Sequence, residues 1–172
     1  MANKNENIVK LADRLAPNQS KFELILAGVA AIALVLKMQH MASMSALLIL
    51  SLSALALLFF FSSYASPSDE TTRMEFFVSK LFAYGSAVVT FGILFILQDW
   101  KRSPTLLFAG CGVLLIGIVV KLMKSEVKIS ITKPALILII ALGLYFTPKE
   151  KLKEMNILQD HAVVSSGSTT GG

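Results

Sequence analysis

An uncharged stretch of 23 residues, 42–64, constrains this chain more than any other feature of its sequence. A helix of about 20 apolar residues spans the ~30 Å hydrocarbon core of a bilayer. Residues 42–64 are therefore predicted to form a transmembrane helix. The stretch ends in aromatic residues that suit the interface between lipid and water, Phe59, Phe60, Phe61 and Tyr64.

Four further apolar runs alternate with polar patches along the rest of the chain. The mean hydropathy is +0.69 and 16% of the residues are charged, against roughly 25% in a typical soluble domain. We therefore predict an all-α membrane protein, a bundle of about five transmembrane helices within a domain of residues 22–147. The spans are expected at 22–38, 42–64, 76–98, 104–122 and 130–147.

The segments on either side of this domain are short and polar. Residues 1–21 are predicted to form a cytoplasmic amphipathic segment, because their apolar residues recur at helical i, i+3, i+4, i+7 spacing. These residues are Ile8, Leu11, Ala12 and Leu15. Residues 148–172 are predicted to form a short amphipathic helix followed by a disordered tail rich in Ser, Thr and Gly.

Two helix starts can be predicted from residues that commonly cap helices. Ser20 and Glu23 have the spacing of a capping box, with Ser20 as the N-cap of the first span. Pro67 follows Ser66 and suits the first position of a helix. The third helix is therefore expected to be long, running from Pro67 to about Gln98.

The Lys and Arg residues are divided unequally between the two membrane faces that five spans would create. Ten lie on the face of the N-terminus and six lie on the opposite face. Basic residues accumulate on the cytoplasmic side of membrane proteins. The bias predicts a multi-pass protein with its N-terminus in the cytoplasm and its C-terminus on the other side.

The two tight connections carry a candidate interfacial polar site that consists of Lys37, His40, Asp99 and Trp100. Lys37 and His40 lie one turn apart at the end of the first span. They could offer a cation and a titratable imidazole to a partner, a lipid headgroup or a proton. Simple anchoring at the interface explains the same residues, and the sequence supports both interpretations.

No catalytic, cofactor-binding or metal site is predicted. The spans carry no charged residue or His near their middle, which pumps and ion-coupled transporters generally need. The single cysteine, Cys111, and two distant histidines lack the spacing of zinc ligands. The net charge of +5 is attributed to residues flanking the spans rather than to a nucleic-acid surface. We expect a protein that is not an enzyme, holds no cofactor and binds no nucleic acid.

Small residues at helical spacing predict close packing of two helices. Gly85 and Gly92 are seven residues apart, as are Gly110 and Gly117. Small residues let membrane helices approach each other closely. The predicted contact could lie inside the bundle or between two copies of the chain.

The first two predicted hairpins are similar to each other at an offset of 59 residues. Gln39 recurs as Gln98 and Leu48 recurs as Leu107. The similarity predicts a duplicated helical hairpin plus one extra helix. Leucines are common in any two membrane spans, so two ordinary hairpins explain the similarity equally well.

Several residues of the first predicted hairpin carry a resemblance to one protein family. They are Gly28, the run Leu34-Val35-Leu36-Lys37-Met38-Gln39-His40, then Ala42, Leu47, Leu48, Phe59, Phe60 and Pro67. Over residues 22–67 the chain resembles the two-helix membrane hairpin of the GldL family, the gliding-motility and type IX secretion motor proteins of Bacteroidetes. A fainter version is expected at 81–122. The family's embedded glutamate would fall near Ala54 or Leu55, so this chain lacks it.

The resemblance implies a related hairpin in an inner membrane, and the missing glutamate argues against a working motor. The favoured function is a non-catalytic integral membrane scaffold or accessory subunit. Its expected partners are the lipid bilayer and either a second copy or another membrane protein. The alternatives are a proton-driven motor or secretion component and a small transporter or channel.

Overall fold

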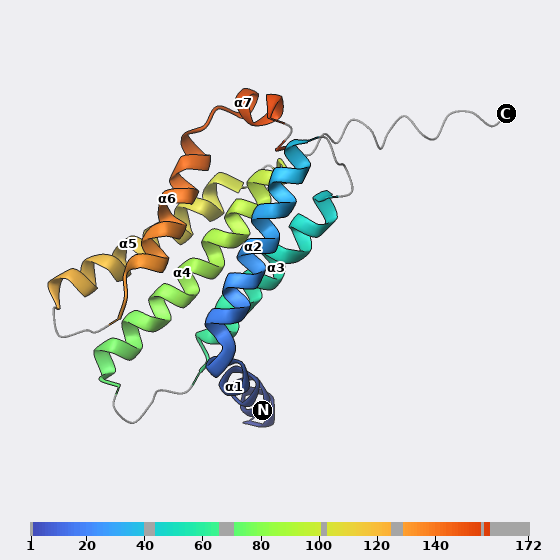
Figure 1. Ribbon diagram of the computed structural model, residues 1–172. Helices are drawn as coiled ribbons and strands as arrows, with labels where there is room; N and C mark the ends of the chain where they lie inside the picture. The colour runs from blue at the N-terminus through green and yellow to red at the C-terminus, as the bar shows by residue number, and fades with distance from the viewer. Residues whose placement is uncertain are drawn as a thin grey trace.

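Helices α2 to α6 run alternately up and down and lie side by side, as Figure 1 shows for the computed structural model. The structure describes residues 2–39, 44–65, 71–100, 103–124, 129–155 and 157–158. Helix α4 is central, because it contacts α3, α5 and α6. The elements are α1 (Ala2–Leu15), η1 (Ala16–Asn18), α2 (Gln19–Met38), α3 (Met44–Ser62), α4 (Arg73–Leu97), α5 (Ser103–Met123), α6 (Thr132–Phe146) and α7 (Lys149–Glu154).

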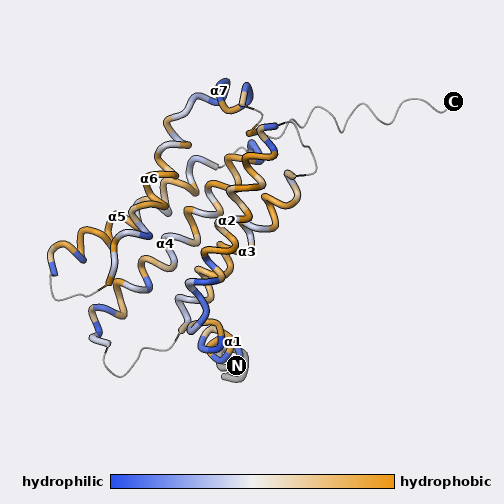
Figure 2. The backbone as a smooth tube through the Cα atoms, viewed as in Figure 1, coloured by the Kyte–Doolittle hydropathy of each residue, from blue (hydrophilic) through white to orange (hydrophobic). Residues whose placement is uncertain are grey.

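Apolar residues cover most of the length of these helices and polar residues gather near the ends of the bundle, as the colours of Figure 2 show. Within the described residues, α3, α4 and the segment Pro104–Met123 of α5 are long and apolar enough to cross a membrane. The predicted fold class, an all-α membrane bundle, is confirmed. Membrane crossing by α2 and by the 15-residue α6 stays a prediction.

The start of α2 differs from the predicted capping box. The helix begins at Gln19, and its N-cap Asn18 makes no side-chain capping bond. Gln19 already has helical backbone angles where η1 ends, whereas an N-cap residue has extended ones. Ser20 is therefore an interior residue of the helix, and the prediction that it caps α2 is wrong. Glu23 is consequently available for the contacts described below.

The start of α4 also differs from the prediction. Pro67 lies outside the described residues, but Thr72 has an extended backbone with φ −68° and ψ 153°, so no helix continues through it. Thr72 is the N-cap instead. Its hydroxyl accepts from the Glu75 N–H at 3.2 Å, and its own N–H donates to Glu75 Oε2 at 3.0 Å. These are the two bonds of a capping box.

The predicted hairpin repeat has a counterpart in the positions of the helix ends. Helix α2 ends at Met38 and α3 begins at Met44, and α4 ends at Leu97 and α5 begins at Ser103. Both pairs of boundaries therefore share the offset of 59 residues. The two hairpins have the same register at their connections.

Helices α1 and α7 lie at opposite ends of the bundle (Figure 1). Helix α1 contacts α3, and its Ala12 is buried. Helix α7 follows α6 directly and buries Leu152. The residues of the predicted disordered tail, from Ala162 onward, lie outside the described part of the chain. The two short helices therefore mark the two polar ends between which the apolar helices extend.

Candidate functional site

An ion pair joins the beginnings of α2 and α6, although 110 residues separate its partners in the chain. Lys133 Nζ lies 2.7 Å from Glu23 Oε2 and also donates to Ser20 Oγ at 3.2 Å. Gln19 Nε2 donates to the other carboxylate oxygen at 2.6 Å. The Glu23 side chain is 11% exposed and that of Lys133 is 61% exposed. The carboxylate is thus largely enclosed, whereas most of the lysine side chain is exposed. We call this end of the bundle the Lys133 end.

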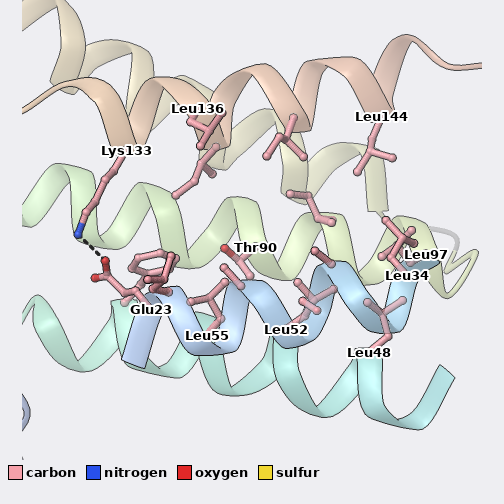
Figure 3. Close-up of a pocket in the computed structure, with 18 of the residues that line it drawn as sticks. Glu23, Leu34, Leu48, Leu52, Leu55, Thr90, Leu97, Lys133, Leu136 and Leu144 are labelled. Carbon is pink, nitrogen blue, oxygen red and sulfur yellow. Dashed lines mark hydrogen bonds and ion pairs between the residues drawn. The ribbon is translucent and has the colours of Figure 1, made fainter. Parts of the chain in front are cut away.

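A groove of about 550 Å³ extends from this ion pair along the bundle, between α2 and α6 (Figure 3). Helices α3 and α4 supply its floor. Leu24 of α2 and Leu136 and Ile140 of α6 line its sides and are well exposed. The groove is therefore open toward the surroundings of the bundle. Its size lies within the ~300–1,000 Å³ of common ligand sites.

Two hydroxyl groups of the helices that form the floor of the groove are hydrogen-bonded within their own helices. Thr90 lines the groove, and its hydroxyl donates to the Ser86 carbonyl oxygen at 2.7 Å. Ser51 is buried in α3 and donates to the Leu48 carbonyl oxygen at 3.1 Å. Such bonds satisfy a hydroxyl donor without water. The floor is therefore chemically apolar, and the Lys133 end supplies the charged groups.

The opposite end of the bundle holds a buried lysine that binds the C-terminal segment. Lys37, in the last turn of α2, is 3% exposed, and its Nζ donates to the Ile157 carbonyl oxygen at 2.6 Å. The Ile157 N–H in turn donates to the Leu152 carbonyl oxygen at 2.9 Å. Leu152, Ile157 and Leu158 are buried in one cluster with apolar residues of α2, α3 and α4. The segment is thus part of the core. We call this end of the bundle the Lys37 end.

Asp99 ends α4 in a conformation that few residues other than Gly adopt, with φ 51°. Its N–H donates to the Ile96 carbonyl oxygen at 2.9 Å, and the Trp100 N–H donates to that of Phe95 at 3.0 Å. These are the bonds of a Schellman motif. The Phe95 and Trp100 ring centroids are 4.4 Å apart, which is the apolar contact typical of that motif. Asp99 Oδ1 also accepts from Lys149 Nζ at 2.8 Å.

The structure places three of the four residues of the predicted polar site, and all three lie at the Lys37 end. Lys37 and Asp99 bind partners that are 120 and 50 residues further along the chain. Trp100 follows Asp99 in the chain and is 49% exposed. The fourth residue, His40, lies outside the described residues. The contacts at this end therefore depend on the C-terminal segment rather than on the two connections alone.

Glu23 and Lys133 were not singled out by the sequence as a site. The spacing of Glu23 after Ser20 predicts a helix cap, and Lys133 is one of several basic residues that flank the expected spans. The sequence does show that an acidic residue and a basic residue each lie near the start of an expected span, which would allow an ion pair. That signal does not say which two spans are neighbours in space.

Four glycines lie at the contact between α4 and α5. A Cβ added to Gly110 would lie 2.7 Å from the backbone nitrogen of Val89. Gly85, Gly92 and Gly117 would bring a Cβ to 2.7, 2.9 and 2.7 Å from atoms of the facing helix. Real Cβ atoms do not approach other atoms this closely. The four glycines therefore serve a contact inside one chain.

No group of three or more His, Cys, Asp or Glu residues in the described ranges is arranged to hold a metal ion. Comparison of the chain with family models, with curated proteins and with solved structures gives no match. The resemblance of the first hairpin to the GldL family, and the functions that it implies, therefore stay predictions.

Proposed function

We propose that this chain is a non-catalytic integral membrane protein that serves as a scaffold or accessory subunit. The observation that supports this is the distribution of charge along the bundle. Glu23 and Lys37 lie about 21 Å apart along α2, at ~1.5 Å per residue. Along the bundle axis, the region between Glu23 and Lys37 contains no Asp, Glu, His, Lys or Arg in the described parts of helices α2 to α6.

The packing between the two ends favours a static role for the bundle. A path for protons or ions across a bilayer needs titratable or water-binding groups at depth. The buried hydroxyls of Ser51 and Thr90 instead bond to carbonyl oxygens of their own helices. The glycine contacts bring α4 and α5 too close together for water to pass between them at those points. Such a bundle can position other membrane components without conducting.

The outer faces of the bundle are suited to a membrane and to neighbours within it. Ile32 of α2, Leu50 of α3 and Ile116 of α5 are 61%, 68% and 57% exposed. Exposed apolar residues of this kind are covered by lipid or by other membrane helices. We propose that one of these faces contacts a second copy or another membrane protein.

Reconstitution into liposomes that contain a pH-sensitive dye tests the static role. An imposed proton gradient should decay no faster with the protein than in empty vesicles. In native membranes, a photo-crosslinker attached at Ile32→Cys, Leu50→Cys or Ile116→Cys should give a discrete protein adduct from at least one face. A protein-dependent proton flux that Asp99→Asn or His40→Ala abolishes would overturn the proposal in favour of a conduction path. Lipid adducts alone from all three faces would overturn the accessory role.

A further inference from the structure

The groove between α2 and α6 has the length of an acyl chain in one leaflet. It extends from Glu23 to Leu34 on α2 and from Lys133 to Leu144 on α6 (Figure 3). Eleven residues of helix rise about 16 Å at ~1.5 Å each, and one leaflet is about 15 Å thick, half of a ~30 Å core. Leu34, Leu97 and Leu144 lie together at the far end. A chain that enters at the Lys133 end would end there.

The volume of the groove selects among possible occupants. About 550 Å³ of groove along about 16 Å of helix leaves a narrow space, which suits a single extended chain. The last eight residues of the given sequence are only Ser, Thr and Gly, which have little apolar surface to bury there. A single acyl chain is both thin enough and apolar, and the open side of the groove admits it from the bilayer.

The charges at the mouth of the groove match a headgroup that carries both signs. The Lys133 ammonium group has three N–H donors, and the structure uses two of them, for Glu23 and Ser20. The third can bind a phosphate oxygen. The Glu23 carboxylate has two oxygens with about four acceptor positions, and it can accept from an ammonium group of the ligand. Charge-assisted bonds of this kind are among the stronger hydrogen bonds.

We propose that this groove binds one phosphatidylethanolamine molecule. One acyl chain lies along the groove between α2 and α6, the phosphate binds Lys133, and the ethanolamine ammonium group donates to Glu23. The choline headgroup has no N–H donor for Glu23, and the glycerol headgroup has no positive charge. The site therefore distinguishes phosphatidylethanolamine from the two other common phospholipids. This inference does not depend on the scaffold role, because a groove for a lipid can serve any membrane protein.

Native mass spectrometry of the purified protein tests the proposal directly. The detergent-solubilised protein is mixed with equal amounts of dioleoyl phosphatidylethanolamine, phosphatidylcholine and phosphatidylglycerol, and the retained lipids are counted by mass. One phosphatidylethanolamine per chain should be retained about tenfold more often than either other lipid. Glycerophosphoethanolamine, which is the headgroup without acyl chains, should not displace it, because the groove supplies most of the binding surface.

Matched variants separate the groove from the headgroup site. Ala27→Phe places a large side chain in the groove and should abolish retention. Ala109→Phe is the control, because Ala109 is an exposed alanine of α5 outside the groove. Glu23→Gln and Lys133→Met should leave one lipid bound but reduce the preference for phosphatidylethanolamine to below twofold. Thermal unfolding in detergent identifies any variant that loses its fold. If Glu23→Gln and Lys133→Met fail to fold, Ala27→Phe still tests whether the lipid lies in the groove.

Three results would overturn the proposal. The first is retention of the three lipids in equal amounts by the unchanged protein, which would exclude recognition of the headgroup. The second is retention that Ala27→Phe leaves unchanged, which would place the lipid elsewhere on the bundle. The third is an efficient crosslink between two copies through Leu136→Cys at the side of the groove, which would make a second copy the occupant.

Discussion

The ammonium group of Lys37 lies 2.6 Å from the carbonyl oxygen of Ile157, a residue 120 positions further along the chain. This one bond connects the end of the first long helix to the segment that follows the last short one. Lys37 is 3% exposed, so the bond forms in a protected environment where an unmet donor or acceptor is costly. The Lys37 end of the bundle is therefore complete only when the C-terminal segment is docked.

Replacing Lys37 by Met should loosen the segment after α7. The variant removes the donor and leaves the Ile157 carbonyl oxygen without it, at a cost of about 1–3 kcal/mol. Because 1.4 kcal/mol corresponds to about a tenfold change in an equilibrium, amide exchange at Leu152 and Ile157 should accelerate by about tenfold. Hydrogen exchange read by mass spectrometry measures this. The control is Lys21→Met, which removes an exposed lysine of the same helix. Equal protection in both variants would mean that the bond does not hold the segment.

Adding a methyl group at Gly110 should destabilise the bundle, and adding one at Gly112 should not. The new Cβ at Gly110 would lie 2.7 Å from the backbone nitrogen of Val89, whereas nothing lies within 4 Å at Gly112. Gly110→Ala should cost about 1–3 kcal/mol through overpacking. Gly112→Ala should be neutral or stabilising by up to ~1 kcal/mol, because Ala favours helix. Thermal unfolding in detergent compares the two. Similar melting temperatures would show that α4 and α5 can separate without cost.

The stability of variants at Asp99 should depend more on how well the new residue adopts the left-handed backbone conformation than on its charge. A residue at φ 51° is best Gly, and Asn and Asp tolerate it. Asp99→Gly should therefore keep or raise stability, while Asp99→Val should lose about 1–2 kcal/mol. The ion pair with the 67% exposed Lys149 side chain should matter less, since exposed pairs contribute only about 0–1 kcal/mol. Lys149→Met isolates that contribution. A larger loss for Lys149→Met than for Asp99→Val would reverse this ranking.

Much of the fold could be predicted because membranes permit few structures. Within lipid a chain must satisfy its backbone hydrogen bonds internally, so each apolar run of sufficient length becomes a helix. The uncharged run at 42–64 accordingly contains α3 (Met44–Ser62). Helix starts were harder to predict. The Thr-x-x-Glu pattern of Thr72 and Glu75 was present in the sequence, but Pro67 offered a competing start a few residues earlier.

The contacts that form the candidate site could not be predicted from local patterns. Lys133 meets Glu23 only because α6 packs beside α4 and faces α2 across the groove. Nothing in the spacing of either residue specifies that neighbour. The same holds for Lys37, whose carbonyl partner on Ile157 has no side-chain signature at all. The polar ends of the bundle could therefore be predicted from the sequence, but the pairs of residues that meet there could not.

The termini should lie on opposite sides of the membrane if all of α2 to α6 cross it. In a Cys111→Ala background, an impermeant thiol reagent added to intact cells should label Ser166→Cys and spare Asn5→Cys. The 10-to-6 distribution of basic residues sets the expected direction. Labelling of both probes or of neither would mean an even number of crossings. The 15-residue α6 is then the first helix to examine.

The contact between Lys37 and Ile157 also sets an order of events during synthesis. A ribosome that adds roughly 5–20 residues per second needs about 6–24 s to make the 120 residues between them. During that interval the carbonyl oxygen of Ile157 is not yet available to Lys37. The first hairpin is therefore made well before this bond can form. Truncation just before Ile157 would prolong that immature state indefinitely, which makes the C-terminal segment a point at which quality control can distinguish finished from unfinished copies.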